Sequence, residues 1–210
     1  MATCVIFNAG EFDSLIEPIG QEDCLLVADG GLVHTERLGL TPDGILGDFD
    51  SLGYVPENAE VFPMEKADTD SMLAIRRGLA LGYRRFVLYG ALEGPRPDHT
   101  LANYQALHFL AEQGAQGYLV GHHHLVTVLK NGSLHFDAHA NGVISVFCIG
   151  PDARGVTIKG LQYPLENAAL TANFPLGVSN RFTGRSSSIC VEDGSLLILY
   201  DRKNGFPRDK

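Results

Sequence analysis

Short apolar runs alternate with helix-like stretches over the first 122 residues. The runs are three to five residues long and lack polar alternation, which is typical of strands buried on both faces. Between them, apolar residues recur at helical spacing, as in Met72, Leu73, Ile75, Leu79 and Ala80. We expect strands at residues 4–8, 24–28, 44–46, 86–89 and 118–120, and helices at 31–38, 70–81 and 99–113. This alternation predicts an α/β domain at residues 1–122, with a mostly parallel sheet flanked by helices.

The pattern changes after residue 122, where no long helical period is present. The expected strands are residues 125–129, 134–136, 143–148, 156–158, 188–191 and 196–200. Asn131-Gly132, Asn141-Gly142 and Asp193-Gly194 are typical turn sequences between such strands. We therefore predict that residues 123–210 form a second domain, an all-β antiparallel sandwich or barrel, with the join near residues 121–125.

Composition and charge limit the classes of function. The 210-residue chain carries a formal net charge of −9 and has no basic stripe, which argues against a nucleic-acid partner. No apolar run approaches the roughly 20 residues of a membrane span. The four cysteines form no CxxC pair, and they are expected to be free thiols of a cytoplasmic protein rather than disulfides or zinc ligands.

Acidic motifs follow the expected strands of the first domain. Asp29 lies in the sequence ADGG (28–31), Asp48 and Asp50 in GDFDS (47–51), Asp68 and Asp70 in DTD (68–70), and Asp98 in RPDH (96–99). Ligands of parallel α/β sheets bind at the carboxyl ends of strands, so we expect these loops to converge. Taken singly, Asp68 can be an N-cap and Asp50 a turn residue.

The spacing of Asp48 and Asp50 suggests how a cation would be held. An extended backbone would send both carboxylates to one face and Phe49 to the other. Two carboxylates on one face repel each other unless a cation lies between them, and Mg²⁺ prefers oxygen ligands, among them phosphate oxygens. An acidic protein that handles phosphates needs such a cation. We therefore predict a magnesium and nucleotide polyphosphate site.

Glycines support this prediction without matching a common fingerprint. Gly30 and Gly31 would let the backbone approach a ligand, and residues 90–94 would form a flexible loop before a helix N-terminus, which favours phosphate. The P-loop and GxGxxG sequences are absent. The run His122-His123-His124 is not assigned a metal, because adjacent histidines cannot all face one ion.

The ordered set of motifs resembles the thiamine pyrophosphokinase family along nearly the whole chain. The motifs of this set are ADGG, GDFDS, DTD, the stretch from Gly90 to Asn103 and GVSN (177–180). The resemblance implies an α/β ATP-binding domain, a β-sandwich and a homodimer with shared active sites. It also implies transfer of the diphosphoryl group of ATP to the thiamine hydroxyl, giving AMP and thiamine diphosphate.

Site residues follow from the resemblance one by one. The implied magnesium ligands are Asp29, Asp48, Asp50 and Asp70, and the implied catalytic residues are Arg96, Asp98 and Asp70. The implied residues for binding ATP and thiamine are Asp29, Gly30, Gly31, Asp68, Asn103, Ser179 and Asn180. From residue type, Arg96 would steady the transferred group as a fixed cation, and Asp98 would orient or deprotonate the hydroxyl.

Three other functions remain open from the residues. One is a pyrophosphokinase for another alcohol, such as a hydroxymethylpterin, built on the same aspartates. A second is a non-catalytic sensor of nucleotide or thiamine diphosphate. A third is a metal-dependent phosphohydrolase. The sequence also departs from the family pattern, because Arg181 follows Ser-Asn where an acidic residue is common and the chain has no tryptophan to stack on thiamine.

Overall fold

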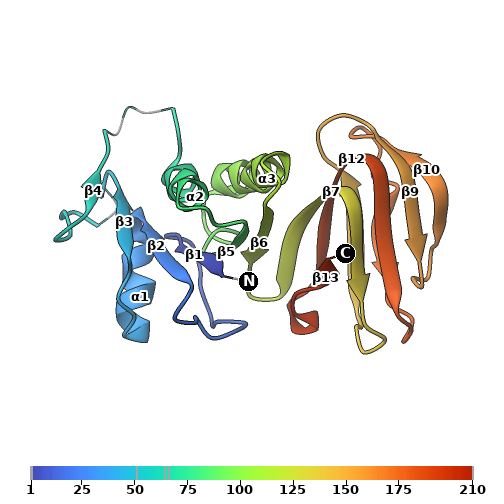
Figure 1. Cartoon of the computed structure of the whole chain (residues 1–210), viewed down its shortest axis with the longest axis horizontal. Coiled ribbons are helices and arrows are strands. Elements are labelled where there is room, and N and C mark those ends of the chain that lie inside the picture. Colours follow the sequence, from blue (N-terminus) through green and yellow to red (C-terminus); the bar gives the residue numbers. More distant parts are fainter. Residues whose placement is uncertain (1, 51, 64, 66, 210) are drawn as a thin grey trace. The chain divides into compact units, whose positions relative to one another are not determined.

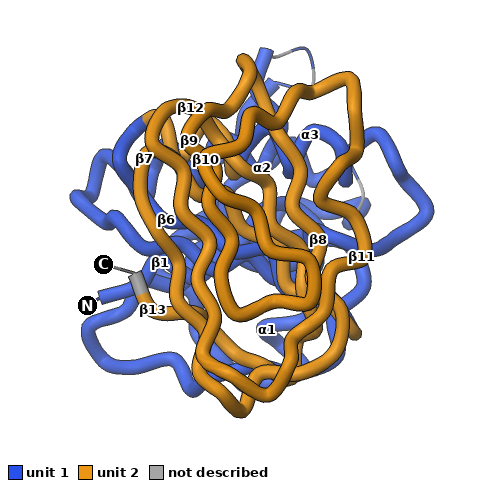
Figure 2. The backbone as a smooth tube through the Cα atoms, turned by 90° about the vertical axis from the view of Figure 1, so that its right-hand side faces the viewer, with its two compact units in different colours: residues 1–106, 113–122 blue, residues 107–112, 123–210 orange. Residues whose placement is uncertain are grey.

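The computed structural model describes residues 2–50, 52–63, 65 and 67–209. The chain forms two compact units, coloured separately in Figure 2. The first consists of residues 1–106 and 113–122, and the second of residues 107–112 and 123–210.

The first unit is built on a parallel sheet. Its strands are β1 (Thr3–Phe7), β2 (Cys24–Ala28), β3 (Gly44–Gly47), β4 (Glu60–Val61), β5 (Arg85–Tyr89) and β6 (Gln116–Val120). Their order is β6-β5-β1-β2-β3-β4, and each neighbouring pair is parallel. Every residue of β1 and β2 is buried, as expected for central strands covered on both faces.

Three helices cover this sheet. They are α1 (Leu32–Leu38), α2 (Asp70–Ala80) and α3 (Pro97–Glu112), and a short 3-10 turn η1 (Asp29–Gly31) precedes α1. In Figure 1, α1 lies on one face and α2 and α3 on the other. Right-handed crossovers explain this, because the β2-α1-β3 connection steps in one direction along the sheet, and β4-α2-β5 and β5-α3-β6 step in the opposite direction.

The second unit is antiparallel, as predicted. Its strands are β7 (His124–Phe136), β8 (Val143–Cys148), β9 (Ala153–Lys159), β10 (Leu165–Leu170), β11 (Gly177–Arg181), β12 (Ser187–Asp201) and β13 (Arg208–Asp209), with a 3-10 turn η2 (Arg202–Asn204). The long strand β12 pairs with β7 along its length, with β9 through its first half and with β8 through its second half. The first and second halves of β12 therefore belong to different layers of a sandwich.

Two predicted turns are wrong. Asn131-Gly132 lies inside β7 and Asp193-Gly194 lies inside β12, so each pair of expected short strands is one long strand. Asn131 and Gly194 have positive φ angles of 44° and 109°, and the β12–β7 register shifts between Val191 and Ser195. These residues form a bulge that bends a strand rather than a hairpin that ends it. Asn131 Oδ1 accepts a hydrogen bond from the Gly194 N–H at 2.9 Å, which fastens the two bulged strands together.

No helix in the described part of the chain has both the length and the apolar character that crossing a membrane requires.

Candidate active site

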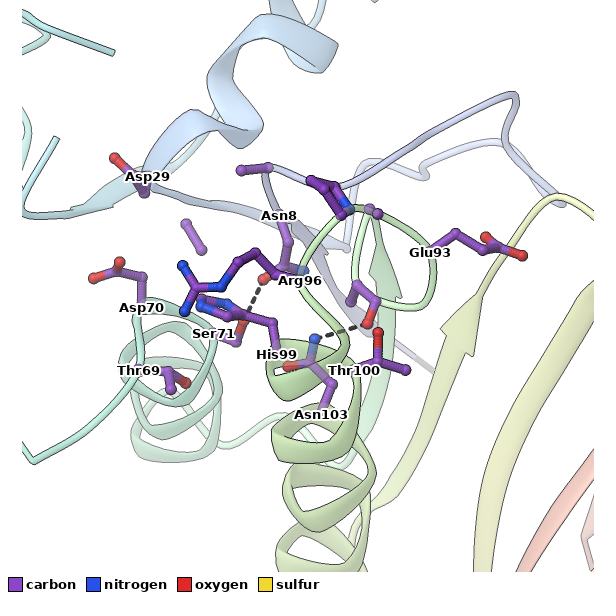
Figure 3. A pocket seen from close by; sticks show the side chains of 17 residues that line it. Asn8, Asp29, Thr69, Asp70, Ser71, Glu93, Arg96, His99, Thr100 and Asn103 are labelled. Carbon is purple, nitrogen blue, oxygen red and sulfur yellow. Dashed lines mark hydrogen bonds between the residues drawn. The ribbon is translucent and has the colours of Figure 1, made fainter. Parts of the chain in front are cut away.

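A cavity of about 240 Å³ lies in the first unit, where the strand order reverses. From β1 the chain continues to β2 on one side, and only later adds β5 on the other side. The carboxyl ends of β1 and β5 therefore diverge, which is where parallel α/β sheets bind ligands. Figure 3 shows Asp29, Asp70 and Arg96 reaching the cavity from three segments. The polar and charged side chains that line it include Asn8, Asp29, Thr69, Asp70, Ser71, Glu93, Arg96 and Asn103.

Asp29 stands directly after β2 in an unusual environment. Its side chain is buried, with 7% of the residue exposed, and its φ of 46° is left-handed. Its Oδ1 atom has no hydrogen-bond partner within the described residues. Burial of a charged oxygen without a partner costs on the order of several kcal/mol. A bound cation would offset this cost. The position is tightly built, since a side chain at Gly47 would come 3.1 Å from the Asp29 Cα and Cβ.

Asp48 and Asp50 follow β3 and meet Asp29. One carboxylate oxygen from each of the three residues can lie within 4.8 Å of the others. Phe49, between the two aspartates in the sequence, is buried, but the extended backbone predicted for this motif is wrong. Phe49 has a φ of 60°, so a tight left-handed turn, rather than strand alternation, turns the two acids to one side. Ser51 of the same motif lies outside the described residues.

These three aspartates fit a hard divalent cation. They supply oxygen ligands of the kind that Mg²⁺ prefers, and Asp29 Oδ1 is a buried acceptor that a cation would satisfy. Their arrangement leaves room for ligands from elsewhere, because three carboxylates fill about half of an octahedral shell. Asp70, the other predicted magnesium ligand, lines the cavity but is not one of the three.

The DTD motif divides into residues with different roles. Thr69, not Asp68, is the N-cap of α2, and its Oγ1 accepts a hydrogen bond from the Met72 N–H at 3.2 Å. Asp70 is the first helical residue and faces the cavity. Asp68 pairs instead with Arg76, whose Nε lies 3.0 Å from Asp68 Oδ2. Asp68 is therefore outside the cavity lining in this structure.

Arg96 and Asp98 form a two-pronged ion pair at the entrance to α3. Arg96 Nε and Nη2 donate to the two carboxylate oxygens of Asp98 at 3.0 and 2.6 Å. Both side chains are more than half exposed. The hydrogen bonds from Arg96 lower the pKa of Asp98 to about 2, and the same contact raises the pKa of Arg96. Arg96 lines the cavity, whereas Asp98 lies outside the lining.

The loop at residues 90–94 is held in place rather than left flexible. Asn103, buried on α3, donates from Nδ2 to the Ala91 carbonyl at 2.7 Å. The Glu93 carbonyl accepts from the Glu11 N–H, and the Glu93 carboxylate accepts from the His122 N–H at 3.0 and 3.1 Å. In Figure 3 that carboxylate points away from Asp29 and Asp70. Asn103 therefore shapes the cavity through the loop that it fastens.

The double glycine serves packing. A Cβ at Gly31 would lie 2.2 Å from the Phe7 carbonyl oxygen, so only glycine lets the turn after β2 pass over the end of β1. We expected Gly31 to let the backbone approach a ligand, but in this structure it lets the backbone approach Phe7. Neither Gly30 nor Gly31 lines the cavity.

Comparisons with known proteins match both units to one family. The model of the thiamin pyrophosphokinase catalytic domain matches residues 16–119, and that of the thiamin pyrophosphokinase vitamin B1 binding domain matches residues 132–196. The thiamine pyrophosphokinase of Bacillus subtilis is 25% identical over 180 residues, which span 81% of this chain and 84% of that protein.

The chain belongs to the thiamin pyrophosphokinase family. Its function is accordingly that of a thiamine diphosphokinase, a transferase of the kinase type.

Solved structures agree on the fold. The thiamine pyrophosphokinase structure from Bacillus subtilis aligns with a TM-score of 0.83 at 22% identity, over 95% of this chain and 98% of that one. The structure from Candida albicans aligns with a TM-score of 0.73 at 14% identity, over 95% and 89%. The α/β unit followed by a β-sandwich is thus the architecture of thiamin pyrophosphokinases.

The two residues carried over for thiamine lie on β11 in the second unit. Asn180 is buried, and its side chain is occupied by backbone groups: Nδ2 donates to the Tyr163 carbonyl at 2.7 Å, and Oδ1 accepts from the N–H groups of Tyr163 and Arg181 at 2.9 Å. Ser179 is exposed, has a φ of 60°, and donates its N–H to Ser145 Oγ at 3.0 Å. In this structure Asn180 shapes the surface around Tyr163, while Ser179 presents its hydroxyl to solvent.

Sequence reasoning missed several residues that line the cavity. Asn8 and Ser71 are buried there, and neither belongs to the motifs that carried the resemblance. Asn8 ends the first apolar run, and this position next to a strand end was the available signal. Ser71 follows Asp70 on the helix and offered no signal of its own. His122, left without a metal role, has Nε2 3.1 Å from Glu11 Oε2.

Proposed function

We propose that the chain transfers the diphosphoryl group of magnesium-bound ATP to the hydroxyl of thiamine, and that the polyphosphate is held in the cavity at the ends of β1 and β5. The buried oxygen of Asp29 within the three-aspartate cluster carries this proposal. An acidic cluster of this kind repels ATP unless a divalent cation lies between them.

Asp29, Asp48 and Asp50 would hold magnesium, and Asp70 lines the same cavity as Asp29. The cation supplies charge neutralisation between the carboxylates and the phosphates. The remaining contribution of the protein is positioning and electrostatic stabilisation, as expected for phosphoryl transfer.

The guanidinium group of Arg96 lines the cavity and can stabilise the negative charge of the transferred group. Its planar fork already binds a carboxylate in two prongs, and phosphate oxygens offer the same geometry. Asp98 is a weak base at a pKa of about 2, so orienting Arg96 or the alcohol suits it better than removing a proton. A phosphate that drew Arg96 away would raise the pKa of Asp98 again.

Thiamine would be bound by the second unit, with Ser179 and Asn180 at its centre. No tryptophan is present, so any ring that stacks on thiamine belongs to tyrosine or phenylalanine. Tyr163, fastened by Asn180, and Phe174 are more than half exposed. Leu176 and Val178, beside and on β11, are also exposed, which suits a surface covered in a homodimer. The dimer would bring the second unit of one copy to the cavity of the other.

One assay separates this function from its rivals. AMP release from magnesium ATP is measured with thiamine, with a hydroxymethylpterin and with no acceptor. We expect release only with thiamine, and its loss when magnesium is chelated. Release with the pterin alone would reassign the acceptor, and release without an acceptor would indicate a phosphohydrolase. Binding without release in any arm would indicate a sensor.

A mixing experiment tests the shared sites. Asp48→Asn and Asn180→Ala variants, each shown to be folded, are mixed under conditions that exchange subunits and assayed at a thiamine concentration low enough that the raised Michaelis constant of Asn180→Ala leaves it nearly inactive alone. Half of a random mixture is heterodimer with one intact site of two, so activity should return to about a quarter of wild type. No recovery after confirmed exchange would place the whole site in one chain.

The free state of all four cysteines supports a cytoplasmic location, where thiols stay reduced.

A further inference from the structure

A buried hydrogen-bond chain runs beneath the cavity and connects three elements. Asn8, at the end of β1, is 6% exposed, and Ser71, in the first turn of α2, is 9% exposed. Asn8 Nδ2 donates to the Tyr89 carbonyl at the end of β5 at 3.1 Å. Ser71 Oγ donates to Asn8 Oδ1 at 2.6 Å, the bond drawn between these residues in Figure 3.

The direction of this chain is fixed by chemistry. The Tyr89 carbonyl oxygen can only accept, so the amide nitrogen of Asn8 must face it and Oδ1 must face Ser71. Because Oδ1 carries no hydrogen, the Ser71 hydroxyl must donate. Its one proton is thereby used, and the hydroxyl keeps only lone pairs for other partners. Such a group suits a cation or its water rather than a phosphate oxygen.

The chain also fixes the position of α2. The Thr69 cap satisfies the N–H of Met72 within the helix itself. Ser71, one residue after Asp70, is the hydrogen-bonded link from this first turn to β1, and through Asn8 to β5. These are the two strands between which the cavity opens. The Asn8–Ser71 bond therefore ties the residue next to Asp70 to the ends of β1 and β5.

We propose that Asn8 and Ser71 are positioning residues that hold the Asp70 carboxylate toward the cation bound by Asp29, Asp48 and Asp50. The inference rests on the proposed magnesium site, and it assigns a role to two residues outside the motifs of the family resemblance. It differs from a purely structural role because its loss weakens cation binding rather than folding alone.

The test is metal affinity without nucleotide. Mn²⁺ and Mg²⁺ are titrated calorimetrically into wild type and Ser71→Ala, a change that removes one oxygen atom. We expect the dissociation constant to rise about fivefold to tenfold, which corresponds to about 1–1.4 kcal/mol. Asn8→Ala, which also loses the bond to the Tyr89 carbonyl, should give at least a similar rise, and the double variant little more than Asn8→Ala, because both changes break the Asn8–Ser71 bond. If Asn8→Ala does not fold, Ser71→Ala decides alone.

Thr35→Val is the matched control. Thr35 is fully buried on α1, outside the cavity lining, and loses a hydroxyl hydrogen bond to the Leu32 carbonyl in this variant. It should lose stability without a change in metal affinity. A second readout is rescue: excess magnesium should restore turnover of Ser71→Ala but not of Asp48→Asn.

The outcomes distinguish this inference from the proposed function. Wild-type metal affinity in Ser71→Ala, with reduced thermal stability only, would overturn the positioning role whatever the enzyme catalyses. Weakened metal affinity in a protein that releases no AMP with thiamine would support the positioning role and contradict the proposed reaction.

Discussion

The two units present their polar residues in different ways. In the first unit, Asp29 stands in a turn beyond the end of a parallel strand, and its Oδ1 atom has no hydrogen-bond partner among the described residues. In the second unit, Asn180 lies within a strand, and its amide is bound to backbone groups on both sides. A buried group whose bonding capacity is unfilled indicates a ligand, whereas one whose capacity is filled indicates a scaffold. By this criterion Asp29 belongs to the chemistry and Asn180 to the support of the surface around it.

The largest expected effect is on turnover. Asp48→Asn and Asp50→Asn each remove one charge from the cluster and should lower the rate of AMP release by about 10²-fold or more, on the order of 2.7 kcal/mol. Asp152→Asn, which removes an exposed charge in the second unit, is the control and should keep normal turnover. Near-normal rates in both cluster variants would show that the GDFDS motif only forms a turn and does not bind the cation.

The scaffold role of Asn180 predicts a loss of stability. Asn180→Ala leaves the Tyr163 N–H and carbonyl without their partner, and we expect a loss of about 1–3 kcal/mol in the free energy of unfolding. Chemical denaturation measures the loss, and the thiamine Michaelis constant should rise with it. Ser179→Gly, which relaxes a left-handed backbone position, serves as the comparison and should not destabilise the protein. Unchanged stability of Asn180→Ala would instead make its amide a direct ligand.

Asp29 should respond in the opposite direction. Asp29→Asn removes a buried charge that lacks a partner among the described residues, and it relieves repulsion with Asp48 and Asp50. In chelator we expect the variant to be more stable than wild type by about 1 kcal/mol, because the metal-free wild type keeps a buried, uncompensated carboxylate. In excess magnesium the order should reverse, since wild type alone gains full binding energy. Thermal unfolding with and without magnesium measures both arms. A destabilised variant in chelator would show that the Asp29 charge is satisfied by the fold.

Sequence patterns predicted most of the parallel unit because most of its elements have one dominant signal, whereas the short exposed strand β4 was not predicted. Apolar runs gave β1, β2 and β5, and helical spacing gave α2. Asp29, Asp48 and Asp50 lie close together because parallel strands place their carboxyl ends at one edge, whereas Asp68 and Asp98 lie outside the cavity lining. Strand β10 escaped prediction, since its largely exposed residues 165–169 form no apolar run. The bulges at Asn131 and Gly194 escaped it too, because the same residues can end a strand or bend one, and only the partner strand decides.

The site was less predictable than the fold for a related reason. The sequence shows two acids at Asp68 and Asp70, but it does not show that Asp68 forms an ion pair with Arg76 and lies outside the cavity lining. Likewise, Asn180 carries the resemblance, yet its bonding to Tyr163 depends on a loop 17 residues earlier in the chain. Ser71 has no visible role until Asn8 is placed beside it from 63 residues away.

The smallest effect concerns Asp98, which is exposed and whose charge is set by Arg96. Its pKa of about 2 is below the ordinary value of 3.8, and the hydrogen bonds from Arg96 are the first cause. A depressed folded pKa contributes stability above the ordinary value, and that contribution is lost as the pH falls through about 2. Arg96→Gln should therefore move the carboxyl titration of Asp98 up toward 3.8, as measured by ¹³C NMR. Glu112, whose pKa is lowered by Lys130, should not move and controls for a global change. A non-hydrolysable ATP analogue with magnesium should produce a similar upward shift in wild type, because its phosphates would compete for Arg96. If the analogue binds and the pKa of Asp98 stays near 2, Arg96 keeps its carboxylate partner in the complex, and another group must steady the transferred phosphoryl group.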